Sequence, residues 1–285
     1  MGGTNQGTPR SRTLGARLLA ARTAAGLTVR QLAERLEINH STLVRYEGGT
    51  RSPKPEVVAT IAGALGLNGA EREELLELAR GADDRTWLAV SMPEQQRQLA
   101  ALLAFERTAT RITDVSMLLL PGLLQTSDYA RAIMIAAEVP DTQIDTRVAV
   151  RVGRRDALTR KNPAHLTAVI WEPVLREMIG GPQVMADCLR YLETVADWPN
   201  VDLRVIPGDA GWHHALEGSF VLDHFEDEPA VVHLETRASG LFLHEKEDVA
   251  VYEEAAEKVL RVAMSAADSK ALIAREAKRI EETIA

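Results

Sequence analysis

The feature that most constrains this chain is a series of helix start and stop signals in its N-terminal part. Apolar residues recur at helical spacing from Leu14 to Ala25, and Gly26 ends that stretch. Thr28, with Gln31 three residues later, forms a capping box that predicts the start of a second helix. These residues therefore predict two short helices joined by a tight turn.

Three more helical stretches follow along the chain. Asn39 can accept hydrogen bonds from the free donors of a first turn, which predicts a third helix over residues 40–47. The stretch "GGTRSPKP" is typical of a turn, Pro55 suits the first position of a fourth helix ending near Gly66, and "AEREELLELAR" supplies a fifth. Five short helices within about 80 residues predict a compact all-α domain over residues 14–80.

The third predicted helix has two different faces. About 100° of rotation per residue places Thr42, Leu43 and Tyr46 on one side, which we expect in the core. The opposite side is mainly polar and consists of His40, Ser41, Val44 and Arg45. A helix, a tight turn and a short helix with a polar outer face form a helix-turn-helix, whose second helix enters the major groove of double-stranded DNA. The alternative is a helical bundle with a purely structural role.

This polar face supplies the predicted base contacts. Arg45 can bond bidentately to guanine and Val44 can touch a thymine methyl group, whereas His40 and Ser41 are less selective. The predicted phosphate contacts lie at the start of the second helix and in the loop after the third. They are Thr28, Arg30, Thr50, Arg51 and Lys54.

The charge of the chain is unevenly distributed. Residues 1–67 hold nine Lys/Arg and four Asp/Glu, a net charge of +5. The remaining residues, 68–285, hold 24 Lys/Arg and 37 Asp/Glu, a net charge of -13. Residues 1–13 have the composition of a disordered tail, from which Arg10 and Arg12 can reach a minor groove. A basic head on an acidic body indicates a DNA-facing module attached to a part that avoids DNA.

Residues 81–285 combine helical stretches with runs rich in β-branched residues. The helical stretches are predicted over residues 93–107, 127–138, 141–160, 183–196, 246–264 and 266–283. The strand-like runs are "RITDVSMLL", "LTAVIWE", "VDLRVIP", "GSFVLDH", "AVVHLET" and "LFLH". Short polar turns separate the last three, which predicts an α+β domain with an antiparallel sheet.

A possible ligand or partner pocket is predicted where a loop, a strand end and "GDAGWHH" meet. Its candidate lining consists of Gln125, Tyr129, Trp171, Glu172, Trp212 and His214. The alternative is a loop that tucks Leu123 and Leu124 into the core. A basic stripe on one predicted helix has two readings as well, internal pairing or a partner surface; it consists of Arg147, Arg151, Arg154 and Arg155.

Several classes of function lack support in the sequence. Nucleotide-binding and hydrolase signatures are missing and the histidines lack metal-ligand spacing, so we expect no enzyme, no cofactor and no metal. No apolar run approaches the ~20 residues that span a bilayer, and we expect no membrane partner. The single cysteine, Cys188, allows no internal disulfide, which favours a reducing cytoplasmic location.

The stretch "LGARLLAARTAAGLTVRQLAERLEINHSTLVRYEGGTRSPKPEVVATIAGALGL" resembles the Cro/repressor (XRE) family nearly end to end, because helices, caps and turns agree in order. The resemblance implies a five-helix Cro/repressor-type domain and a structural ion pair between Arg22 and Glu47. The family usually has Gln or Ser where His40 stands, so its base preference does not carry over.

Residues 100–275 resemble the C-terminal domain of WhiJ-like actinobacterial regulators. The resemblance rests on "MLLLPGLLQTSDYARAIM", "EDVAVYEEAAEKVLRVAMSAADSKALI" and the stretch from "WEPVLREM" to "FVLDHF". It implies a domain that senses an unknown small-molecule ligand or a small protein partner encoded nearby. We therefore expect a sequence-specific transcriptional regulator, acting as a homodimer because one short helix reads few base pairs. The alternative is an antitoxin-like protein that sequesters a small partner and autoregulates its operon.

Overall fold

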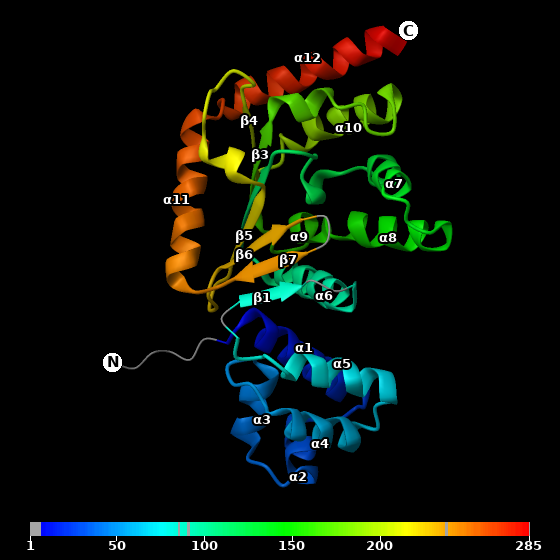
Figure 1. Cartoon of the computed structure of the whole chain (residues 1–285), viewed down its shortest axis with the longest axis vertical. Coiled ribbons are helices and arrows are strands. Elements are labelled where there is room, and N and C mark those ends of the chain that lie inside the picture. The colour runs from blue at the N-terminus through cyan, green and yellow to red at the C-terminus, as the bar shows by residue number, and fades with distance from the viewer. Residues whose placement is uncertain (1–6, 85, 90–91, 237–238, 285) are drawn as a thin grey trace. The chain divides into compact units, whose positions relative to one another are not determined.

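The computed structural model describes residues 7–84, 86–89, 92–236 and 239–284 (Figure 1). The chain divides into two compact units. The first unit extends to Ala104 and includes Thr236–Lys246, and the second consists of Phe105–Glu235 and Glu247–Ala285. The division does not fall at residue 80, where the helical domain was expected to end.

Five short helices form most of the first unit, as the caps and glycines predict. They are α1 (Pro9–Ala24), α2 (Val29–Arg35), α3 (His40–Glu47), α4 (Pro55–Leu65) and α5 (Gly69–Ala79). The capping box of Thr28 and Gln31 and the Asn39 cap are both formed. The helices enclose a core of buried aliphatic side chains, among them Leu14, Leu18, Leu32, Leu43, Val58 and Ile61.

Helix α1 begins at Pro9 and not at Leu14, so residues 9–13 belong to a helix and the predicted disordered tail is wrong there. Proline suits the first helical position, and the Thr8 hydroxyl caps the helix by accepting the Ser11 N–H at 3.0 Å. Residues 1–6 of that predicted tail lie outside the described residues.

Because α1 starts at Pro9, the two predicted minor-groove contacts, Arg10 and Arg12, are part of this helix. Arg12 is buried, and the Arg10 guanidinium lies 5.5 Å from the ring centre of Trp87. Both side chains are therefore held within the first unit and do not extend from a tail. No local pattern indicates this arrangement, because Arg10 packs on Trp87, which is distant along the chain.

The first unit also contains a pair of strands. Strand β1 (Thr86–Ala89) pairs antiparallel with β7 (Gly240–Leu243). The Gln98 amide, on α6 (Met92–Thr108), donates hydrogen bonds to the carbonyl oxygens of Trp87 at 2.5 Å and Gly240 at 3.2 Å. These contacts join β1, β7 and α6 to one another, and the contact of Arg10 with Trp87 links β1 to α1.

The second unit contains a mixed sheet. Its strands are β2 (Arg111–Ser116), β3 (His165–Trp171), β4 (Val201–Ile206), β5 (Phe220–His224) and β6 (Val231–Glu235). They lie in the order β6-β5-β2-β3-β4. The β2–β5 and β5–β6 pairs are antiparallel, but β2–β3 and β3–β4 are parallel, which the antiparallel prediction did not include. Helices join the parallel strands, as a parallel crossover requires.

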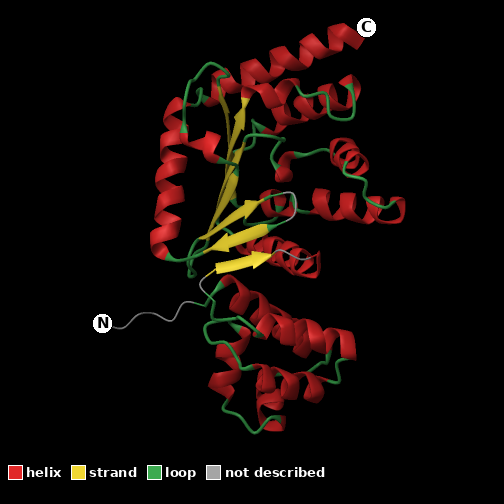
Figure 2. Ribbon diagram, in the orientation of Figure 1, coloured by secondary structure: helices red, strands yellow, loops and turns green. Residues whose placement is uncertain are grey.

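Helices pack around this sheet (Figure 2). They are α7 (Ser127–Ala136), α8 (Asp141–Gly153), α9 (Asp156–Thr159), α10 (Pro182–Val195), α11 (Lys246–Val262) and α12 (Ala266–Ile284), with 3-10 turns at Gly122–Leu124, Glu172–Arg176 and His214–Glu217. Side chains of β3, α10 and α12 share one core, in which Cys188 is fully buried. Among the described helices, none is long and apolar enough to cross a membrane.

Candidate nucleic-acid interface

A tight turn joins α2 to α3. Glu37 adopts a left-handed backbone conformation with φ of 53°, and the Ile38 N–H returns to the carbonyl oxygen of Ala33 at 3.1 Å. This arrangement satisfies the last carbonyls of α2. The Asn39 side chain then accepts the Ser41 N–H at 2.9 Å, so α3 starts only a few residues after α2 ends.

Helix α3 presents the two faces that its sequence predicts. Leu43 and Tyr46 are buried against the domain core. The four predicted base contacts, His40, Ser41, Val44 and Arg45, are all exposed. Val44 keeps 45% of its surface exposed among polar neighbours, which suits an apolar contact to a base.

The five predicted phosphate contacts are also exposed, at the two ends of this surface. The Thr28 hydroxyl donates to Gln31 Oε1 at 2.9 Å and Thr50 donates to the Arg45 carbonyl oxygen at 3.3 Å, so both hydroxyls have local acceptors. The Arg51 guanidinium lies 5.8 Å from the ring centre of Tyr46. Lys54 occupies the N-cap position of α4.

The cations of this surface carry no internal counter-charge. In the part of the chain that the structure describes, no ion pair involves Arg30, Arg45, Arg51 or Lys54. Arginines of the second unit, such as Arg154 and Arg190, are by contrast paired with carboxylates. Exposed cations without a carboxylate partner attract phosphate, so this surface has the electrostatics of a nucleic-acid interface.

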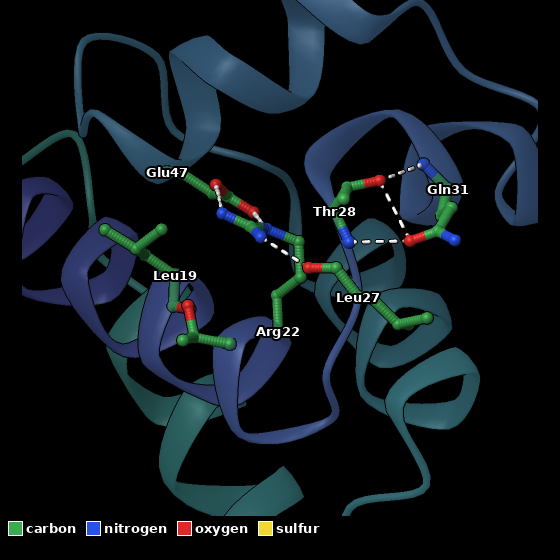
Figure 3. Close-up of polar contacts among 7 residues, drawn as sticks. Leu19, Arg22, Leu27, Thr28, Gln31 and Glu47 are labelled. Carbon is green, nitrogen blue, oxygen red and sulfur yellow. Dashed lines mark hydrogen bonds and ion pairs between the residues drawn. The ribbon is translucent and has the colours of Figure 1, made fainter.

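Arg22 and Glu47 form a bidentate ion pair that fixes α3 to α1 (Figure 3). The Arg22 Nε and Nη2 atoms donate to Glu47 Oε1 at 2.6 Å and Oε2 at 2.9 Å. Its Nη1 atom donates to the Leu27 carbonyl oxygen at 2.6 Å, just before α2. The hydrogen bonds to Glu47 raise the pKa of Arg22. One side chain therefore holds α1, the start of α2 and the end of α3 together.

A second support of α3 was missed by the sequence reasoning. A Cβ atom at Gly15 would lie 2.6 Å from the backbone oxygens of both Tyr46 and Glu47. The Ser11 hydroxyl donates to the carbonyl oxygen of Gly49 at 2.6 Å. Helix α1 therefore lies so close to the end of α3 that no side chain fits at position 15 without a shift. A glycine in a helical stretch was the available signal, because it often marks such an approach.

A groove of about 430 Å³ lies elsewhere in the same domain, between α1, the end of α4 and α5. Its lining is mainly small and apolar, including Ala20, Ala24 and Leu65, beside the ion pair of Arg17 and Glu74. None of the predicted DNA contacts lines it.

Two residues of the predicted pocket in the second unit, Gln125 and Tyr129, lie in the core. Gln125 and Tyr129 are buried, and both bond the backbone of Leu120. The Gln125 amide donates to the Leu120 carbonyl oxygen at 2.8 Å, and the Tyr129 hydroxyl accepts the Leu120 N–H at 3.3 Å. They therefore hold the loop in the core, together with the buried Leu123 and Leu124.

The other four predicted pocket residues have different surroundings. Trp171 packs partly buried against the core. Glu172 Oε2 accepts the N–H of Gly208 at 2.8 Å, which anchors the "GDAGWHH" loop. Trp212 is 66% exposed, with its ring edge-on to His214 at 4.9 Å between centres. Trp212 and His214 thus lie on the surface, and not with Gln125 and Tyr129 in one lined cavity.

Two arginines of the predicted basic stripe, Arg154 and Arg155, lie between α8 and α9 and have internal partners. Arg154 donates to the buried Glu106 at 2.5 and 2.8 Å. Arg155 donates to the Gln125 carbonyl oxygen at 2.8 Å and its guanidinium lies 4.3 Å from the ring centre of Tyr191. Internal pairing is therefore the correct reading for these two arginines.

The caps, the short exposed α3 and its cation-rich rim define a DNA-binding protein of the helix-turn-helix class. Comparison with known families agrees, because residues 13–75 match a helix-turn-helix domain. Residues 99–275 match a domain of unknown function, DUF5753, and the chain belongs to this family. A comparison with curated proteins finds no match.

One solved structure is similar to part of the chain. It is the crystal structure of the clp gene regulator ClgR from C. glutamicum, 31% identical, with the alignment covering 27% of this chain and 94% of that one. The TM-score is 0.22, so this likeness carries no argument, and the assignment rests on the family matches and the geometry.

Proposed function

We propose that this protein is a sequence-specific transcriptional regulator that reads DNA with α3 and acts by binding rather than by catalysis. One observation carries the proposal: the exposed face of α3 presents His40, Ser41, Val44 and Arg45 on a helix held rigidly by caps and by the Arg22–Glu47 pair. A rigid, exposed, cation-rimmed helix suits the major groove.

The regulator would act in the cytoplasm as a homodimer, because one α3 contacts too few base pairs to be selective. The second unit would modulate it through a ligand or a small protein partner. Its acidic character supports this division of labour, because residues 105–235 and 247–285 hold 18 Lys/Arg and 29 Asp/Glu, a net charge of -11 that repels the DNA backbone.

The first test is selection and sequencing of genomic fragments bound by the purified protein at about 150 mM salt, where non-specific affinity is low. An inverted repeat is expected among the bound fragments. Recovery of no enriched sequence would contradict a regulator that acts alone and would favour a protein that needs its partner first.

Substitution of Arg45 by alanine tests the base-reading role. Arg45→Ala should cost about 1–3 kcal/mol of binding free energy and relax the sequence preference. The matched control is Arg72→Ala, an exposed arginine of α5 outside the α2–α3 surface. Unchanged affinity and preference in Arg45→Ala, measured by fluorescence anisotropy on matched and mismatched sites, would show that α3 does not read bases.

Lys54→Ala tests the phosphate role separately. Because Lys54 is exposed and its contact would be to the backbone, the variant should weaken all DNA sequences alike. The slope of log affinity against log salt should become shallower by about one unit. A loss of affinity for one DNA sequence only would instead indicate that Lys54 contacts a base.

A further inference from the structure

The hydroxyl group of Ser41, on the exposed face of α3, already has an acceptor within the protein. Ser41 Oγ donates a hydrogen bond to Asn39 Oδ1 at 2.8 Å. The same oxygen of Asn39 accepts the Ser41 N–H at 2.9 Å, and this second bond caps the helix. The backbone therefore holds the Asn39 oxygen in place, and the hydroxyl proton of Ser41 points back at the protein.

This hydrogen bond determines what Ser41 can offer to DNA. From its residue type alone a serine is unselective, because its hydroxyl has one proton to donate and lone pairs that accept. Since Asn39 takes the proton, only the lone pairs of Ser41 Oγ remain for a second partner. Arg45, four residues later on the same exposed face, has donors only. The two side chains therefore suit different base atoms.

The four bases differ in what they present to an acceptor in the major groove. Adenine presents its N6 amino group and cytosine its N4 amino group, and both groups donate. Guanine presents N7 and O6 and thymine presents O4, and these three atoms accept. An acceptor at Ser41 therefore finds a donor on adenine or cytosine, but meets a second acceptor on guanine or thymine.

We infer that Ser41 reads an amino base, adenine or cytosine, on the strand that it faces, and that Asn39 sets this preference by holding the hydroxyl proton. The inference rests on the proposed function, because it names bases that the same α3 surface selects. To donate to guanine or thymine, Ser41 would first have to give up its bond to Asn39. One such hydrogen bond corresponds to a preference of about two- to tenfold.

Substitutions of Asn39, a positioning residue, test how the preference arises. Asn39→Gly removes the acceptor but keeps a residue that caps helices nearly as well. The Ser41 hydroxyl can then rotate and donate, so guanine and thymine should bind as well as adenine and cytosine at that position. Asn39→Asp keeps an acceptor for both bonds and should retain the preference, with lower affinity for all DNA because its charge repels phosphate.

Asn68→Gly is the matched control. Asn68 caps α5 in the same way, because its Oδ1 atom accepts the N–H groups of Ala70 and Glu71 at 3.0 Å. It lies outside α2 and α3, so its loss tests helix capping alone and should leave the base preference unchanged. Circular dichroism and thermal unfolding of every variant verify that the fold is kept.

The experiment uses the full chain and selects bound duplexes from a randomised DNA library at about 150 mM salt. Fluorescence anisotropy then compares the four bases at each position of the selected motif. In the wild type, one position of each half-site should bind adenine or cytosine about two- to tenfold more tightly than guanine or thymine. That position alone should lose its preference in Ser41→Ala and in Asn39→Gly.

Three results would overturn the inference and leave the DNA-binding function intact. They are a motif that Ser41→Ala does not change, a preference for guanine or thymine at the position that Ser41→Ala changes, or an Asn39→Gly variant with the wild-type preference. A wild-type protein that selects no motif would contradict both the inference and a regulator that acts alone. The two failures are distinguishable, because a motif is recovered in the first case and none in the second.

Discussion

Arg22 and Glu47 show how one residue pair positions a binding surface. Their side chains are 13% and 8% exposed, so removal of one partner leaves a largely buried charge without compensation. We expect Arg22→Ala to lower the free energy of unfolding by about 3 kcal/mol, with Glu47→Ala similar. Chemical denaturation of the full chain measures this.

A double-mutant cycle completes the test of this pair. The double variant should cost less than the sum of the two single ones, because the two charges interact directly. Arg80→Ala, in an exposed pair with Glu77 on α5, is the control and should change stability by less than about 1 kcal/mol. Additive costs of the two substitutions would mean that Arg22 acts through Leu27 alone.

The buried Asp114 of β2 predicts that the stability of the protein depends on pH. Burial raises its pKa from 3.8 to about 6, against the hydrogen bond from Ser116 and the charge of Arg154, which lower it. Because the pKa is higher in the folded than in the unfolded protein, its contribution to stability is complete below about pH 3.9 and is lost as the pH rises through 6.

We therefore expect Asp114→Asn to gain stability relative to wild type between pH 4 and 7.5, by on the order of 1–3 kcal/mol. Urea denaturation of both proteins across this range measures the difference. The buried His233, whose pKa burial lowers to about 4, opposes the trend but is common to both proteins. A difference that stays constant with pH would show that Asp114 titrates normally.

At the scale of elements, the contact of α1 with α3 determines where the reading helix lies. Gly15→Ala should lower stability by about 1–3 kcal/mol, because its Cβ would clash with backbone oxygens of Tyr46 and Glu47, and it should weaken DNA binding by displacing α3.

Gly63→Ala is the matched control in α4. Its Cβ meets nothing within 4 Å, so alanine should add about 0.5–1 kcal/mol of helix stability and leave DNA binding unchanged. Thermal unfolding and anisotropy measure both variants. An equal gain of stability in Gly15→Ala and Gly63→Ala would mean that α1 and α3 can move apart without loss of stability.

At the scale of the whole molecule, two-fold symmetry makes a geometric prediction about the DNA. If a homodimer binds an inverted repeat, the half-sites should lie about one helical turn apart, on the same side of the duplex. Insertion of about 5 base pairs between them rotates one half-site by half a turn and should abolish cooperative binding, whereas about 10 should restore part of it. Unchanged affinity for both altered DNA sites would indicate that a monomer binds a single half-site.

The sequence by itself determined the helix-turn-helix and most secondary structure, because caps, glycines and apolar periodicity act over a few residues. Thr28, Asn39 and Pro55 start helices where predicted, and the two faces of α3 follow from its sequence. The resemblance to Cro-type repressors supplied the Arg22–Glu47 pair, which spacing alone did not give.

Only the tertiary structure decided which distant segments meet. In the structure, Arg10 and Arg12 lie in a helix and not in a tail, and Arg154 pairs with Glu106. Strand β2 pairs with β3 in parallel. It placed Gln125 in the core and left Trp212 on the surface, although both were predicted to line one pocket. Burial and strand partners depend on contacts between residues far apart in the chain, and a local pattern carries no information about them.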